Sequence, residues 1–273
     1  MIELIKEMFS YHFMIRAIVV GVLVSLCAAL LGVSLVLKRY SMIGDGLSHV
    51  GFGALAIAAA ANIAPLYLAV PVVIAAAFLL LSINQNSKIK GDAAIALISS
   101  SALAIGVVTV SLTTGMNTDV SNYMFGSILS LSRADAVLSV ILSAVVLLMF
   151  VLLYPRIFAV TFDETFACAT GTRAQLINSV IAVLTAVTVV IGMRMMGALL
   201  ISSLIIFPAL TAMRLCRSFK SVVICSGIVS VVCFIVGMAA SYAFELPSGA
   251  AIVIVNIIAF AAFSFAALLK KRA

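Results

Sequence analysis

One acidic and one imidazole side chain stand four positions apart in an otherwise apolar stretch, residues 38–54. The acid is Asp45 and the imidazole is His49, and an uncharged run follows the histidine. Residues four apart lie on the same face of a helix, so a carboxylate and an imidazole would be neighbours there. Such a pair supplies half of the donors of a divalent-metal site. The alternative is that Asp45 caps the start of a helix while neutral His49 bonds to Ser48 or a nearby backbone carbonyl.

Composition defines the broad class of this protein. Of its 273 residues, 65% are hydrophobic and 9% are charged, and the mean hydropathy is +1.35. A soluble chain of this length needs more polar surface, so we expect an integral membrane protein with one transmembrane domain over residues 1–273. The formal net charge is +7. Because the basic residues are scattered between apolar runs, they indicate membrane topology and no nucleic-acid partner.

Neither the cysteines nor the N-terminus indicates a secreted or thiolate-metal protein. The five cysteines form no C-x-x-C pair and mostly fall within apolar runs, which argues against disulfides and against a thiolate zinc site. The apolar run at 17–37 is longer than the core of a cleavable signal peptide, so we expect it to remain as a membrane span.

Nine apolar runs are each close to the length that crosses a bilayer, which predicts an all-α polytopic bundle. They are residues 17–37, 46–63, 66–83, 93–113, 136–154, 176–193, 195–213, 221–243 and 248–269. The short turns at 62–66 and around Arg194 are the least marked boundaries, and a re-entrant bend at either would reduce the count to eight or seven.

Loop charges give the expected orientation. Twelve basic residues fall on the side of the C-terminus, namely Lys38, Arg39, Lys88, Lys90, Arg156, Arg173, Arg214, Arg217, Lys220, Lys270, Lys271 and Arg272. Four fall on the other side, namely Lys6, Arg16, Arg133 and Arg194. Under the positive-inside rule the N-terminus is outside and the C-terminus is cytoplasmic.

Two loops and one proline predict further local structure. The outer loop, 114–135, contains a semi-apolar segment at 123–129 that suits a half-helix. In the inner loop, 155–175, Asp163 and Glu164 suit the first turn of a short helix and Gly171 suits its C-terminal cap, although a plain polar connector is the alternative. Pro208 lies inside a span, where it predicts either a break near a pathway or a simple kink.

The sequence lacks the motifs of nucleotide-binding proteins and of zinc metalloenzymes. The chain has no G-x-x-x-x-G-K-[ST] loop, no loop long enough for a nucleotide-binding domain and no H-E-x-x-H cluster. We therefore expect a transport protein and no enzyme. If it moves a solute against a gradient, the energy comes from another polypeptide or from an ion gradient.

Four stretches together resemble one known family. Residues 41–49, S-M-I-G-D-G-L-S-H, resemble the S-L-I-G-D-A-L-S-H-A signature of the permease subunits of bacterial zinc and manganese ABC importers, the ABC-3 family. Residues 123–129, 162–171 and 196–209 agree with that family in order and spacing. The first and last of the four stretches are the most specific.

The resemblance implies a set of partners and site residues. Two copies of the permease would associate with two cytoplasmic ATP-binding subunits, and an extracellular or periplasmic metal-binding protein would deliver the ion. Asp45 and His49 would be ligands of a transported zinc or manganese ion, with no resident cofactor. Segment 162–171 would be the coupling helix seated on the ATPase, which assigns ATPase coupling to Phe162, Asp163, Glu164, Ala169 and Gly171.

One departure from the family's sequence pattern bears on which metal is transported. Many family members assigned to manganese have H-A-V-L-P-G after the aspartate–histidine pair, whereas this chain has H-V-G-F-G without the proline. This difference favours zinc.

Three alternatives to a metal-importer permease stay open. They are a siderophore or cobalamin permease, a stand-alone ion-coupled carrier and a membrane-embedded metalloenzyme.

Overall fold

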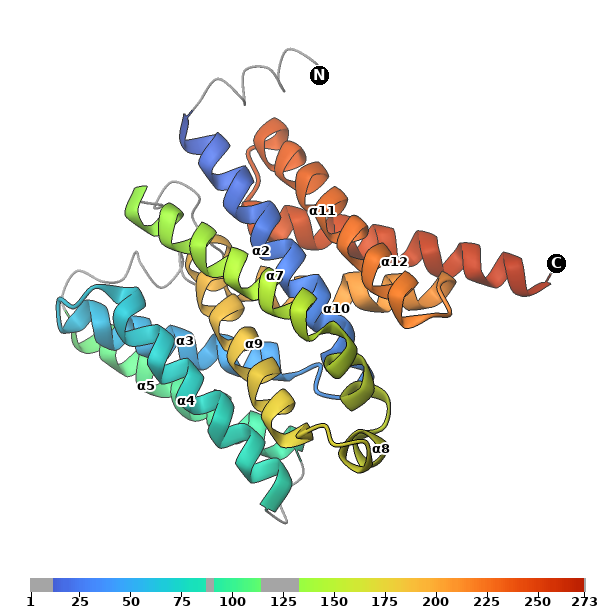
Figure 1. Cartoon of the computed structure of the whole chain (residues 1–273). Helices are drawn as coiled ribbons and strands as arrows, with labels where there is room; N and C mark the ends of the chain where they lie inside the picture. The colour runs from blue at the N-terminus through green and yellow to red at the C-terminus, as the bar shows by residue number, and fades with distance from the viewer. Residues whose placement is uncertain (1–11, 87–90, 114–132, 273) are drawn as a thin grey trace.

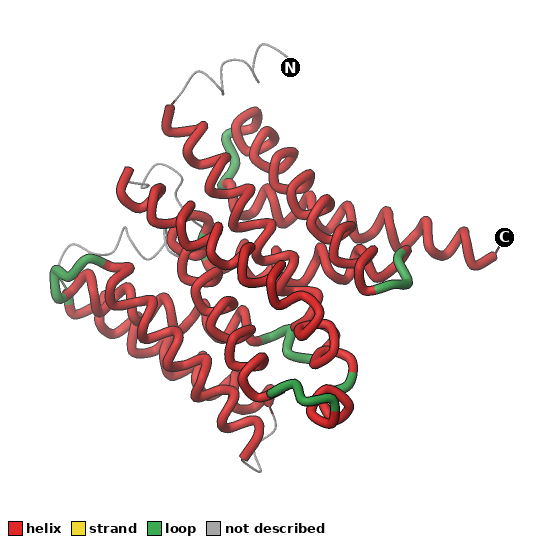
Figure 2. The backbone as a smooth tube through the Cα atoms, viewed as in Figure 1, coloured by secondary structure: helices red, strands yellow, loops and turns green. Residues whose placement is uncertain are grey.

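The structure is a computed structural model that describes residues 12–86, 91–113 and 133–272, so the predicted half-helix at 123–129 lies outside the described residues. The described regular structure is helical throughout (Figure 2). The helices are α2 (His12–Leu37), α3 (Ile43–Ala60), α4 (Pro65–Asn86), α5 (Gly91–Leu112), α7 (Arg133–Phe162), α8 (Glu164–Ala169), α9 (Ala174–Met196), α10 (Ala198–Leu215), α11 (Phe219–Phe244) and α12 (Ser248–Arg272).

Nine of these described helices are long and apolar enough to cross a membrane, which confirms the predicted count. Both of the least marked turns separate two spans. Asn62 ends α3 in the left-handed region (φ 53°), and the N–H of Ile63 donates to the Ala58 carbonyl over 2.9 Å. Gly197 alone separates α9 from α10, and its φ of 86° explains why glycine stands there.

The predicted end of the fifth span is wrong. We expected the inner loop to begin at residue 155, but α7 continues through Pro155 to Phe162. A proline removes one intrahelical hydrogen bond and normally ends or kinks a helix. Here packing holds the last turns, because Ile157 is fully buried and the Phe158 ring lies 5.2 Å from the Phe219 ring of α11. The inner connection therefore consists of α8 and short links on either side.

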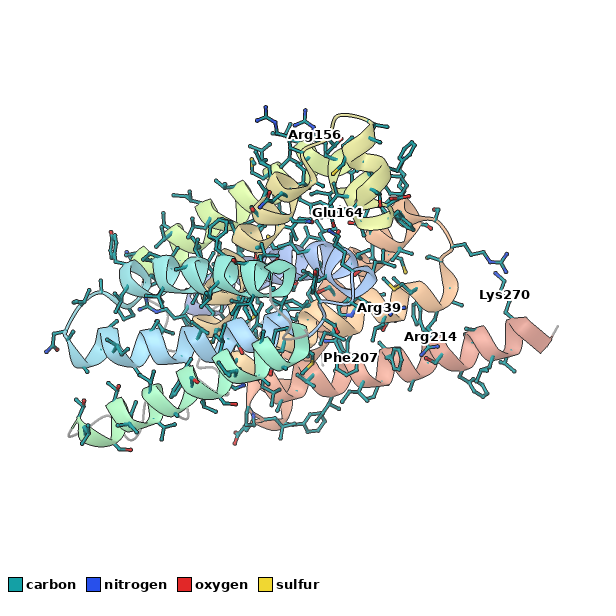
Figure 3. The ribbon with its side chains drawn as sticks, turned by 90° about the horizontal axis from the view of Figure 1, so that it is seen from below. Arg39, Arg156, Glu164, Phe207, Arg214 and Lys270 are labelled. Carbon is teal, nitrogen blue, oxygen red and sulfur yellow. The ribbon has the colours of Figure 1, made fainter. Side chains whose placement is uncertain are left out.

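The helices form a buried centre and an exposed apolar outside. Figure 1 shows α2 and α9 in the middle of the bundle, with α4 and α5 on one side and α11 and α12 on the other. Most of the apolar window of α2, α3 and α9 is buried, whereas little of α4, α5, α7 and α12 is. The outer helices expose large apolar side chains, including Leu112, Leu152 and Phe265. Such a surface suits lipid or a partner subunit. Figure 3 shows α5 and α12 along one face, with Arg156 of α7 and Glu164 of α8 on the opposite side.

The backbones of α3 and α5 approach closely at one glycine. A Cβ built on Gly53 would lie 2.7 Å from the carbonyl oxygen of Ala102, closer than real Cβ contacts allow. The contact fixes the depth at which α3 sits in the bundle. Gly53 therefore positions the helix that carries Asp45 and His49.

We expect Gly53→Ala to destabilise the protein by about 1–3 kcal/mol, because backbone must move to admit the methyl group. The measurement is the thermal aggregation midpoint of the detergent-solubilised protein. Gly227→Ala is the matched control, since its added Cβ meets only the flexible ends of side chains, Leu26 Cδ1 at 3.0 Å and Leu30 Cδ2 at 3.9 Å. Equal midpoints for the two variants would show that the α3–α5 contact is not tight.

Candidate metal site

The first turn of α3 presents the acidic half of the predicted pair. The helix begins at Ile43, its N-cap is Met42, and no side chain caps it. Asp45 lies within the first turn, where the partial positive charge of the helix N-terminus favours a carboxylate. The carboxylate of Asp45 is thus not the helix cap, and it faces groups outside its own turn.

Asp45 and His49 lie side by side. His49 Nε2 is 3.7 Å from Asp45 Oδ2, and the side chains are 22% and 43% exposed respectively. This separation is too long for a direct hydrogen bond. Two ligands of one tetrahedral zinc ion, each at about 2.1 Å, are separated by about 3.4 Å. A small side-chain adjustment would therefore let both atoms bind the same ion.

A third polar side chain reaches the pair from α10. Ser202 Oγ donates to Asp45 Oδ1 over 3.2 Å and lies equally far from the Ala198 carbonyl oxygen. The two carboxylate oxygens of Asp45 thus have different surroundings, with Oδ1 toward Ser202 and Oδ2 toward His49. Sequence reasoning missed Ser202. The only available signal was a pair of serines within the apolar run 196–209.

The described part of one chain supplies too few donors for a complete site. Among the residues that the structure describes, no group of three or more His, Cys, Asp and Glu side chains could hold a metal ion. A structural zinc site generally has four ligands, and a catalytic one has three plus water. A complete site therefore needs donors beyond this pair.

We expect Ser202→Ala to weaken metal transport by about tenfold, the lower end of what outer partners of a metal ligand contribute. The reason is that Asp45 Oδ1 loses the hydroxyl that orients it. Ser203→Ala is the control, because buried Ser203 Oγ donates to the Leu200 carbonyl over 2.8 Å instead. The measurement is the concentration dependence of metal uptake, and identical curves for the two variants would remove Ser202 from the site.

Pro208 is buried within α10, and the helix is continuous across it. Because proline has no N–H, the carbonyl of Leu204 lacks its usual intrahelical partner. The structure thus contains no helix end at this position. A part for Pro208 in the transport pathway stays a prediction.

The predicted short helix in the inner connection is confirmed as α8. Asp163 precedes it as the N-cap, one position earlier than a first-turn residue, and its carboxylate accepts the N–H of Phe166 over 2.9 Å. Gly171 follows it with φ 86°. The N–H of Gly171 donates to Cys168 and that of Thr172 to Ala167, over 3.0 and 2.9 Å. This is the Schellman ending that Gly171 predicted.

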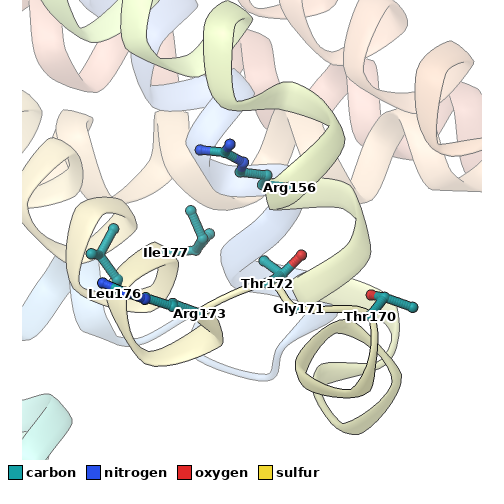
Figure 4. Close-up of a pocket in the computed structure, with 7 residues that line it drawn as sticks. All are labelled: Arg156, Thr170, Gly171, Thr172, Arg173, Leu176 and Ile177. Atoms are coloured by element: carbon teal, nitrogen blue, oxygen red, sulfur yellow. The ribbon is translucent and has the colours of Figure 1, made fainter.

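Helix α8 and the end of α7 expose aromatic side chains. Phe166 of α8 is 64% exposed, and Phe162, the last residue of α7, is 60% exposed. Ala169 of α8 is also exposed. Phe166 was not among the predicted coupling residues, although it lies in the matching segment. A cavity of about 440 Å³ lies where α8 turns toward α9 (Figure 4). Its lining consists of Arg156, Thr170, Gly171, Thr172, Arg173, Leu176 and Ile177.

At the opposite end of the bundle, Arg194 of α9 pairs with Asp135 of α7. Arg194 Nη2 lies 2.9 Å from Asp135 Oδ2, and both side chains are largely buried. Their charges hold two helices together, so neither is freely available to an incoming protein. Arg133 and Glu245 stay exposed among the described residues at that end.

Comparison with known proteins assigns the family. A model of the ABC 3 transport family matches residues 10–267, nearly the whole chain, so the chain belongs to that family. With nine apolar helices among its described residues, it is a multi-pass protein of the bacterial inner membrane.

Three similar proteins illustrate the match. The manganese transport system membrane protein MntC of Listeria monocytogenes is 29% identical, over 96% of this chain and 94% of that one. The high-affinity zinc uptake system membrane protein ZnuB of Haemophilus influenzae is also 29% identical, over 96% and 98%. The structure of PsaBC from Streptococcus pneumoniae in complex with a Fab superposes with a TM-score of 0.86 at 28% identity, covering 96% and 95%.

Proposed function

We propose that this chain is the permease subunit of an ABC importer for a divalent transition metal, with zinc favoured and manganese next. The observation that carries the proposal is the Asp45–His49 pair, 3.7 Å apart on a spanning helix of an ABC 3 family protein. Ionisable groups inside membrane spans are costly and usually serve a pathway. An aspartate and a histidine offer the oxygen and nitrogen donors that zinc and manganese accept.

The functional unit in this proposal is a homodimer whose two-fold axis passes beside α3. Symmetry doubles the pair to two carboxylates and two imidazoles, enough for a four-coordinate ion. The arrangement supports this choice of face, since α3 packs on α5 and α10 packs on α12. Helices α5 and α12 lie along one face (Figure 3), and the exposed apolar surface of that face suits a second copy.

Two further partners complete the proposed importer. A cytoplasmic ATP-binding subunit would receive α8, whose exposed Phe166 is the kind of aromatic anchor that dominates protein interfaces. A metal-binding protein outside the membrane would dock over the other end of the bundle. There, exposed charges such as Glu245 would mainly set its rate of encounter.

The choice of metal rests on sequence alone, because the named relatives include one for manganese and one for zinc. The absence of proline after His49 favours zinc. The test is reconstitution of the chain with its ATPase and binding protein in proteoliposomes, followed by uptake of labelled zinc and manganese. We expect ATP-dependent zinc accumulation that exceeds manganese accumulation. Uptake that needs a proton gradient and no ATP would instead establish a stand-alone carrier.

A further inference from the structure

Three polar side chains from three segments meet beside α8. Lys38 comes from the connection between α2 and α3, Glu164 from the start of α8 and Asn178 from α9. Lys38 Nζ donates to Asn178 Oδ1 and lies 3.5 Å from Glu164 Oε2. Asn178 Nδ2 donates to Glu164 Oε1 over 3.0 Å. The three groups form a closed triangle in which each side chain contacts the other two.

The triangle is largely shielded from water on one side. The Lys38 side chain is 11% exposed and Asn178 is buried, whereas the Glu164 side chain is 49% exposed. Burial lowers the pKa of the Lys38 ammonium, and the Glu164 carboxylate opposes that shift. A shielded ammonium depends strongly on its partners, because water cannot replace them. Glu164 is thus the outward end of the triangle and Lys38 is its inward end.

The backbone around Lys38 is fixed by hydrogen bonds. Arg39 adopts φ 61°, its N–H donates to the Val36 carbonyl over 3.1 Å, and the N–H of Tyr40 donates to Leu35 over 2.8 Å. This is a Schellman ending on α2 built without glycine. The N–H of Ile43 then donates to Tyr40 over 3.0 Å, which leads directly into α3. The connection from Lys38 to the first turn of α3, where Asp45 lies, is therefore short and internally hydrogen-bonded.

We propose that the Lys38–Glu164–Asn178 triangle transmits movement of α8 to the start of α3 and so couples the ATPase contact to Asp45. The inference rests on the proposed function, because it requires α8 to be the ATPase contact. Lys38 is in this view a positioning residue that contacts neither the metal nor the ATPase. Its ion pair joins segments that are 126 positions apart (164 − 38), and no other described acidic side chain forms an ion pair with Lys38.

A triangle that only stabilises the structure and a triangle that transmits movement lead to different expected results. If the triangle only held α8 in place, its loss would detach the ATPase or destabilise the permease. If it transmits movement, its loss leaves the ATPase bound and hydrolysing ATP while metal uptake falls. The ratio of metal transported to ATP hydrolysed separates the two cases.

The test is a charge exchange in the reconstituted importer. Lys38→Glu is expected to retain the ATPase but to transport at least about tenfold less metal per ATP, which corresponds to about 1.4 kcal/mol of lost coupling. Glu164→Lys is expected to lower the same ratio and, because Glu164 belongs to the proposed ATPase contact, also to weaken ATPase binding. The double variant Lys38→Glu/Glu164→Lys restores the pair with reversed polarity and should recover much of that ratio. Lys38→Arg should stay close to wild type. Arg39→Glu is the control, since Arg39 is exposed and has no ion pair with Glu164 in the structure.

Three outcomes would overturn the inference. They are a normal ratio in Lys38→Glu, a double variant no better than the single ones, and loss of the ATPase from the neutral variant Lys38→Gln. Lys38→Gln and Glu164→Gln introduce no opposite charge. If a reversed charge prevents assembly, the ratio of metal transported to ATP hydrolysed is measured in these two variants instead.

Wild type is measured in parallel. Absent ATP-driven uptake in wild type would reject the proposed function itself, whereas normal wild-type uptake confines a negative result to the triangle.

Discussion

Replacing His49 with alanine is expected to abolish ATP-driven metal uptake while the protein still folds and enters the membrane. The imidazole faces Asp45 Oδ2 and is partly exposed, so its removal leaves no large cavity. In a symmetric pair the substitution removes two of four ligands. Loss of outer partners alone costs about 10–100-fold in metal affinity, and loss of direct ligands costs at least as much. Uptake of labelled zinc into proteoliposomes measures the effect.

Asp45→Asn should have the same effect, because it keeps the shape of the side chain but removes its charge. Ser48→Ala is the control, since Ser48 Oγ donates to the backbone carbonyl of Asp45 and leaves the carboxylate untouched. Normal zinc uptake by both His49→Ala and Asp45→Asn would reject this pair as the pathway ligands. Loss of uptake in Ser48→Ala as well would point to damage to the helix.

Gly171→Val is expected to release the ATPase from a folded permease. An added Cβ at Gly171 would meet no atom within 4 Å, so the effect comes from backbone conformation and not from a clash. The φ of 86° is unfavourable for a β-branched residue, at a cost of about 1–3 kcal/mol. Relief of that strain opens the Schellman ending and changes the direction in which α8 presents its aromatic surface. Co-purification of the ATPase with tagged permease measures the outcome.

Gly171→Asn is the matched control for this prediction, because asparagine tolerates the left-handed region better than valine does. It should retain more of the ATPase than Gly171→Val. If Gly171→Val keeps the ATPase and transports normally, the contact lies elsewhere on the cytoplasmic side. The connection at 214–220, between α10 and α11, would then be the next segment to test.

Features set by local sequence were predictable. Each span is an apolar run bounded by charges or turn residues, and this pattern survives any arrangement of the bundle. The C-terminal cap of α8 was likewise predicted, because glycine suits that position, whereas Asp163 was expected in the first turn and is instead the N-cap. The end of α7 was misplaced because the apolar run was taken to end at residue 154, whereas ring contacts with Phe219 hold the helix beyond Pro155.

Features set by long-range packing were not predictable. Ser202 reaches Asp45 across 157 positions, and Lys38 reaches Asn178 across 140. Nothing in a single sequence specifies which buried polar groups will meet. Arg39 in a left-handed conformation was also unexpected, because glycine is the usual residue there. The predicted pair was visible only because both of its members lie in one helical turn.

The sharing of one metal site between two copies is the central claim, and mixed dimers test it most directly. Wild-type and His49→Ala copies carrying different tags are expressed together, and the mixed species is isolated by two successive affinity steps. A shared site predicts that one altered copy suffices, so uptake by the mixed dimer falls at least about tenfold below that of a doubly tagged wild-type dimer. Retention of half the wild-type rate would show that each copy carries its own complete site, and would contradict the account.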